Sequence, residues 1–179
     1  LAKALVMIVL VMIPFALFET ITGRPLWIEA LQSIPGIRTV TDARSTAREL
    51  FGVTLERVQL GFAHPIHFGL FCAVTFSMCV VALEGPLRSR WRWALGVIIA
   101  STACLALSSG ALLAFALQIG LITWAIGFKA LKRRWWLLCG VLVAGYVTVD
   151  VLSNRTPIQV FMSYATFSPH TAYWRALIF

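Results

Sequence analysis

Charged residues are scarce in this chain of 179 residues: they make up 12% of it, against about 25% in soluble domains. Hydrophobic residues make up 60%, and acidic residues number seven. The scarcity of charge argues strongly against a water-soluble domain, and the high hydrophobicity excludes a disordered chain. A membrane protein is the class that remains.

Cysteine is also scarce. The chain has four, which are too few to staple a secreted module of this length. No Cys-x-x-Cys pair, histidine-rich tract or carboxylate cluster predicts a metal site, and we expect no cofactor. All four fall within apolar runs, so we expect them to pack as small hydrophobes: Cys72, Cys79, Cys104 and Cys139.

Five apolar runs predict membrane-spanning helices. A hydrocarbon core of about 30 Å requires about 20 helical residues, because all backbone hydrogen bonds must be internal. Cleavage as a secretory signal is an alternative for the first run alone. We therefore expect an all-α, polytopic membrane helix bundle with about five transmembrane helices. The runs are residues 4–18, 64–83, 93–107, 111–128 and 135–152.

These runs make residues 1–179 a single transmembrane domain. The chain begins with Leu1 rather than methionine and reaches Phe179 within an apolar run. We therefore interpret it as part of a longer polypeptide.

Basic residues gather at two connections between the runs. Both connections should be cytoplasmic, because cytoplasmic loops carry an excess of lysine and arginine, and tryptophans at their edges suit the interface. The net charge of +8 is therefore mostly a topology signal rather than a sign of nucleic-acid binding. The basic residues are Arg88, Arg90 and Arg92 in one connection, and Lys129, Lys132, Arg133 and Arg134 in the other.

This topology places three segments on the outer face: residues 19–63, 108–110 and 153–179. The first is a loop whose five arginines and five acids cancel, and the last begins a larger outer segment. The outer basic residues are all arginines, whose planar guanidinium suits phosphate, so an anionic ligand is indicated there. Within the first loop, Asp42 predicts the start of a short surface helix that ends at Gly52.

One group of candidate residues lies where the chain re-enters the membrane. Arg57 is followed by His64-Pro65 and then by His67. Pro65 is an ordinary first residue of a helix, and a lone histidine at an interface is often structural. Two histidines and an arginine at the mouth of a span are less ordinary, because His67 would need a partner inside the bundle.

A second group lies in the last outer segment. Asp150, near the end of the fifth run, needs a partner, and Arg155 is the nearest candidate. His170 and Arg175 follow among tyrosines and hydroxyl groups. The segment fits either an interfacial amphipathic loop or a site for a lipid-linked phosphate and a sugar.

Four stretches, taken in order, resemble the O-antigen ligase and polysaccharide polymerase family, in particular its exopolysaccharide-polymerase-like branch. The similarity covers residues 57–179. The stretches are Arg57 to Gly69 with its His64-Pro65-Ile66, Leu107 to Leu113 with its Ser108-Ser109-Gly110, Ser153 to Pro157, and His170 to Arg175.

The resemblance implies a GT-C-like glycosyltransferase in the bacterial inner membrane, with its active site on the periplasmic face. Such enzymes take a glycan from undecaprenyl diphosphate and join it, with inversion and without a required metal, to an acceptor glycan or to lipid A core. Other proteins of polysaccharide export would be further partners within the lipid bilayer.

The resemblance also implies roles for single residues. Arg57, Arg155 and Arg175 would bind the diphosphate. His64 and His170 are the candidates for catalytic proton transfer, because a neutral imidazole accepts a proton readily near neutral pH. A transporter or flippase for the same lipid-linked oligosaccharide would instead require polar groups at mid-membrane. A scaffold without activity would tolerate substitution of the outer arginines.

Overall fold

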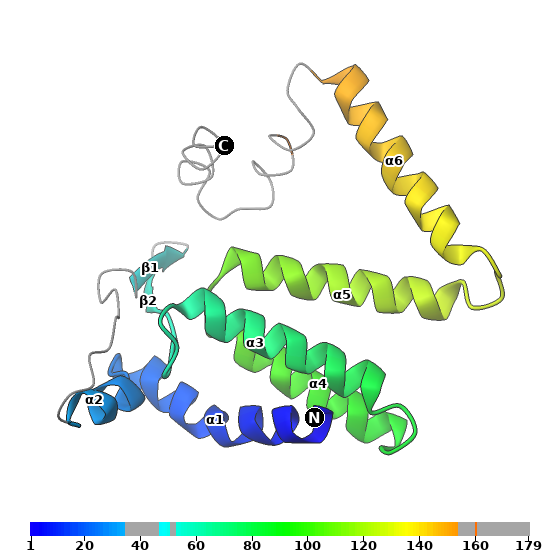
Figure 1. Cartoon of the computed structure of the whole chain (residues 1–179). Helices are drawn as coiled ribbons and strands as arrows, with labels where there is room; N and C mark the ends of the chain where they lie inside the picture. Colours follow the sequence, from blue (N-terminus) through cyan, green and yellow to red (C-terminus); the bar gives the residue numbers. More distant parts are fainter. Residues whose placement is uncertain (35–46, 51–52, 154–159, 161–179) are drawn as a thin grey trace. The chain divides into compact units, whose positions relative to one another are not determined.

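The computed structural model describes residues 1–34, 47–50, 53–153 and 160. Over these residues the chain is helical apart from one two-stranded antiparallel ribbon (Figure 1). It divides into two compact units, Leu1–Phe115 (unit 1) and Ala116–Phe179 (unit 2), with the boundary inside α5. The elements are α1 (Ala2–Thr22), α2 (Leu26–Gln32), β1 (Ala47–Leu50), β2 (Val53–Glu56), α3 (Pro65–Ser77), the π-helix η2 (Met78–Ala82), α4 (Ser89–Cys104), α5 (Ser109–Gly127) and α6 (Arg134–Leu152).

Four helical stretches in the described residues are long and apolar enough to cross a membrane: α1, α3 with η2, α5 and α6. They agree with four of the predicted runs. The run at residues 93–107 corresponds to α4, whose 16 residues span about 24 Å and fall short of a hydrocarbon core of about 30 Å. The structure thus supports a helical membrane bundle, with four candidate spans where the sequence predicted about five.

Within unit 1, α3 and α4 lie side by side and α1 packs against both (Figure 1). Gly96 of α4 allows the close approach, since a Cβ there would lie 3.0 Å from Val80 Cγ2 and 3.3 Å from Phe76 Cε2. Small residues at such crossings matter because helices in lipid associate through close packing rather than through the hydrophobic effect.

A second close approach joins α3 to the α4–α5 turn. A Cβ on Gly69 would lie 2.5 Å from Ala111 Cβ and 3.2 Å from Ala106 Cβ. Both alanines are fully buried, so neither has room to move away. Gly69 thereby fixes the second turn of α3 against the start of α5.

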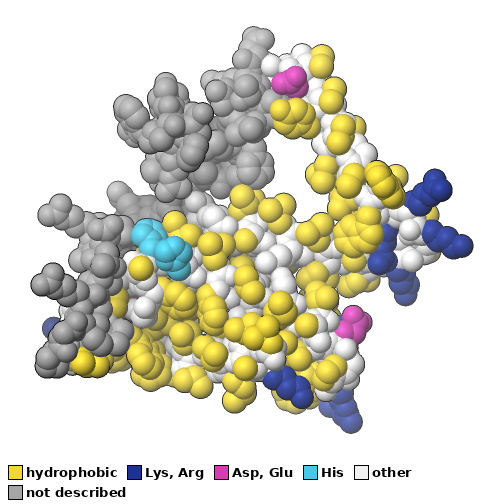
Figure 2. Space-filling model, viewed as in Figure 1, with side chains coloured by type: hydrophobic (Ala, Val, Ile, Leu, Met, Phe, Trp, Pro, Cys, Tyr) yellow, Lys and Arg dark blue, Asp and Glu magenta, His cyan; other side chains and the backbone are white. Residues whose placement is uncertain are grey.

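Large apolar side chains cover much of the surface drawn in Figure 2. Leu142 and Val143 of α6 are 63% and 62% exposed, and α6 buries none of its residues. Exposed apolar surface on this scale is unfavourable in water and is the surface that a helix needs in lipid.

The predicted surface helix from Asp42 to Gly52 is wrong over Ala47–Leu50, and the remainder of that helix lies outside the described residues. Ala47–Leu50 forms β1, which pairs with β2 in antiparallel register, Leu50 opposite Val53. The partner strand explains the difference, because Val53 and Thr54 are β-branched and favour extended backbone. The predicted helix rested on the spacing of residues within one segment and did not consider pairing with these residues.

The cysteine prediction is confirmed for two residues. Cys72 and Cys79 are buried within α3 and η2, whereas Cys104 and Cys139 are exposed. All four are free thiols. Exposure of the latter two places them on the outer surfaces of α4 and α6.

The Gly69 contact predicts that Gly69→Ala destabilises unit 1. The added methyl overlaps Ala111, and overpacking of this kind costs about 1–3 kcal/mol. Thermal unfolding of the purified protein in detergent measures the loss. Gly120→Ala in α5 is the matched control, because no atom lies within 4 Å of the position that its Cβ would take. An unchanged midpoint for Gly69→Ala would contradict the close packing.

Candidate functional site

A buried carboxylate organises one end of unit 1, which we call the histidine end; it comprises the last turn of α1, residues 57–67 and residues 105–108. Glu19 is 4% exposed. Its Oε1 accepts the backbone N–H of Gln59 at 2.9 Å, and its Oε2 accepts that of Leu60 at 3.0 Å. Hydrogen bonds from N–H groups to a carboxylate are among the strong ones, and they offset part of the cost of removing the charge from water.

The backbone at Leu60 has an unusual conformation. Leu60 is 1% exposed and has a φ of 52°, in the left-handed region that a leucine rarely adopts. Such a conformation costs on the order of 1–3 kcal/mol unless its surroundings hold it. The Glu19 carboxylate and the burial of the Leu60 side chain supply that hold.

The end of α4 holds the same segment from the other side. Val58 N–H donates to the carbonyl oxygen of Leu105 at 3.1 Å, and Arg57 Nε donates to that of Ala106 at 3.2 Å. These carbonyls follow the last helical residue, where a helix presents unpaired acceptors and a partial negative charge. The Arg57 guanidinium is therefore oriented by the C-terminus of α4.

His64 caps α3. Its backbone is extended, Pro65 takes the first helical position, and its Nδ1 accepts the N–H of Ile66 at 3.2 Å. His67 follows one turn later, and its ring centroid lies 6.2 Å from that of His64. Both rings appear together on the surface drawn in Figure 2. The sequence prediction that α3 begins at Pro65 is confirmed.

Phe62 fixes how the chain enters α3. Its ring lies 5.9 Å from that of Phe68 and 5.5 Å from that of Phe71, measured between centroids. An apolar residue before the cap that packs on the first turns sets the entry angle of a helix. Nearby, the buried Ser108 accepts the N–H of Ala111 at 3.5 Å and caps α5. The turn predicted at residues 108–110 lies at residues 105–108 instead, because Ser109 and Gly110 already belong to α5.

Two of the five predicted site residues lie in this end of unit 1: Arg57, which is half-buried, and His64. The other three, Arg155, His170 and Arg175, lie outside the described residues. The catalytic and diphosphate-binding roles of all five remain predictions.

Two groups at the histidine end were missed by the sequence reasoning. The sequence predicts Glu19 as the first residue of the outer loop, although α1 continues to Thr22. It is the one acid in an otherwise apolar stretch, and an ionisable group there is a signal for a buried partner. Gln59 is 2% exposed, and its Oε1 has no hydrogen-bond partner within the described part of the chain. No pattern in the sequence singled out Gln59.

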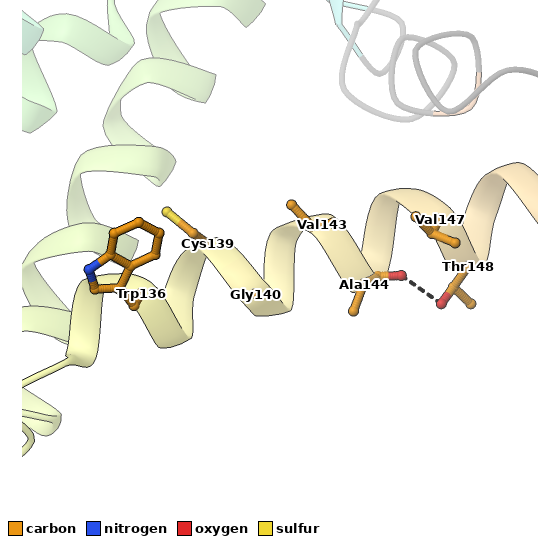
Figure 3. Close-up of a pocket in the computed structure, with 7 residues that line it drawn as sticks. All are labelled: Trp136, Cys139, Gly140, Val143, Ala144, Val147 and Thr148. Carbon is orange, nitrogen blue, oxygen red and sulfur yellow. Dashed lines mark hydrogen bonds between the residues drawn. The ribbon is translucent and has the colours of Figure 1, made fainter.

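A shallow apolar groove runs along α6 in unit 2 (Figure 3). Its one hydroxyl, on Thr148, donates to the carbonyl oxygen of Ala144 at 2.7 Å within the same helix. No charged group lines the groove, so it offers no cation to pair with a phosphate. Within the described residues no group of three or more His, Cys, Asp or Glu side chains could hold a metal ion.

No family model matches the chain, and no curated protein and no solved structure matches it either. The residues at the histidine end and the sequence resemblance are therefore what indicate a function.

The bonds to Glu19 predict that Glu19→Ala destabilises the fold. Two backbone N–H groups would lose their acceptor inside the bundle, at a cost of about 1–3 kcal/mol for each buried group left unsatisfied. Unfolding of the purified protein in detergent measures the effect. Glu29→Ala is the control, since Glu29 is an exposed acid on α2 whose loss should change stability by less than about 0.5 kcal/mol. Equal stability of the two variants would contradict the role given to Glu19.

Proposed function

We propose that this protein is a membrane glycosyltransferase of the polysaccharide polymerase type. It would transfer a glycan from an undecaprenyl-diphosphate donor to an acceptor glycan at the outer face of the bacterial inner membrane. Ligation to lipid A core is the alternative reaction with the same donor. Transport of the lipid-linked oligosaccharide is the alternative from a different class.

One observation carries the proposal: an arginine is oriented at the end of an apolar helical bundle, beside a helix whose N-cap is a histidine. Arg57 is held through its Nε by Ala106, and the segment that carries it is held by Glu19. Arginine stays charged at every relevant pH, and its planar group fits a phosphate in two-point contact. A lipid-linked diphosphate would present such a group at the level of a membrane interface.

The chemistry needs charge stabilisation above all. The acceptor oxygen forms a bond to the sugar C1 while the bond from C1 to the diphosphate oxygen breaks on the opposite face, which inverts the centre. The electron pair leaves with the diphosphate, and the hydroxyl proton passes to a base. Preorganised cations at the leaving group contribute several kcal/mol in a site screened from water.

The hydrogen bond by which His64 caps α3 indicates different roles for the two candidate histidines, His64 and His170. Because His64 Nδ1 accepts the N–H of Ile66, the neutral ring carries its proton on Nε2. In this form His64 is a donor, which suits a phosphate oxygen. We therefore assign the removal of the acceptor proton to His170 and a supporting contact with the donor to His64.

The proposal predicts that Arg57→Gln lowers transfer by about 100-fold or more, the effect of removing one preorganised donor at a developing charge. The measurement is product formation by the purified full-length protein in nanodiscs supplied with an undecaprenyl-diphosphate repeat unit. Arg24→Gln is the matched control, because Arg24 is exposed and its loss changes the net charge equally. Normal yield from Arg57→Gln would overturn the assignment.

The same assay separates the alternatives when it is run with and without lipid A core. A ladder of products without core identifies a polymerase, and a single core-linked adduct identifies a ligase. Donor binding without any product would favour the transporter. One observation favours the transporter. Gln118 lies midway along α5, and its buried Oε1 has no hydrogen-bond partner among the described residues.

A further inference from the structure

The turn between α5 and α6, residues 128–133, is locked by a reciprocal pair of side chains in unit 2. Trp124 Nε1 donates to the carbonyl oxygen of Arg134 at 3.1 Å, and Arg134 donates to that of Ala125 at 2.9 Å. The Arg134 guanidinium also lies 5.6 Å from the centroid of the Trp135 ring. Arg134 is therefore used to build the turn.

The locked turn leaves three other cations exposed: Lys129, Lys132 and Arg133. None of them forms an ion pair within the described residues. The one acid in the described part of unit 2 is Asp150, 17 residues from Arg133 and so about 25 Å away along α6. At that distance an exposed charge is screened by salt. Unit 2 therefore lacks a counter-charge for its own turn.

The charges also oppose the helix that they precede. Arg133 is the N-cap of α6, with no side-chain hydrogen bond to the cap and no acid in the first turn. The N-terminus of a helix carries a partial positive charge, so a cation there is unfavourable, and an anion is favoured. An anion from outside the chain would therefore stabilise both the exposed cations of this turn and the N-terminus of α6.

Aromatic and apolar groups beside the cations indicate where that anion comes from. Trp135 and Trp136 are 47% and 79% exposed, and Leu131 is 48% exposed. Tryptophan favours the boundary between hydrocarbon and headgroups, and this turn lies between two membrane-length helices, since α5 ends and α6 begins there. We propose that residues 128–136 bind the phosphate headgroup of an anionic phospholipid, with Lys129, Lys132 and Arg133 as its ligands.

Lipid titration followed by native mass spectrometry of the intact protein in neutral detergent tests this site. We expect phosphatidylglycerol to bind and phosphatidylcholine to bind more weakly. The variant Lys129→Gln/Lys132→Gln/Arg133→Gln should bind phosphatidylglycerol on the order of 100-fold more weakly, since each cation near a lipid surface contributes about fivefold. The matched control is Lys3→Gln/Arg24→Gln/Arg90→Gln, which removes three exposed cations that lie at different places and should weaken binding by less than about fivefold.

Three results would overturn the site. Equal weakening in both triple variants would mean a diffuse field, equal binding of the two lipids would mean no headgroup recognition, and displacement by millimolar inorganic phosphate would mean a site for free phosphate. Arg133→Asp guards against misfolding of the triple variant. It places an acid at the N-cap, so helix content measured by circular dichroism should persist while phosphatidylglycerol binding falls.

Discussion

The hydrogen bonds from Gln59 and Leu60 to the Glu19 carboxylate are the constraint on which the histidine end depends. They place the segment before α3 between the ends of α1 and α4, so that Val58 reaches Leu105 and Arg57 reaches Ala106. A carboxylate can accept two backbone N–H groups at once. The left-handed conformation of Leu60 depends on these two hydrogen bonds. The orientation of Arg57 and the start of α3 at His64 follow from the same two bonds.

The distribution of charge along the helices has a common pattern. α1 has Lys3 in its first turn and Glu19 near its end, and α6 has Arg133 at its N-cap and Asp150 near its end. Helix dipoles favour the opposite arrangement. The helix dipole therefore does not explain where these charges lie, and their partners do. In unit 1, Glu19 accepts two backbone N–H groups. At the start of α6, the cations bind an anion from outside the chain.

The helical spans could be predicted from the sequence because apolar length is a local property, and the four membrane-length helices begin and end within a few residues of the apolar runs. The cap at His64 was also local, since Pro65 marks it. Glu19 could not be paired from the sequence, because its partners are backbone groups 40 and 41 residues away. The predicted helix over Ala47–Leu50 was wrong for a similar reason. The spacing of apolar residues there suits a helix, but the segment pairs with a second strand that the spacing does not include.

Amide hydrogen exchange in nanodiscs tests the central role of Glu19 most directly. The amides of Gln59 and Leu60 should exchange slowly in the native protein, because both donate to a buried carboxylate, and they should lose most of that protection in Glu19→Ala, whose side chain has no acceptor atom. The amide of Val58 should stay more protected, since its acceptor is the Leu105 carbonyl. Rapid exchange of Gln59 and Leu60 in the native protein, or protection unchanged by Glu19→Ala, would contradict this account of the histidine end.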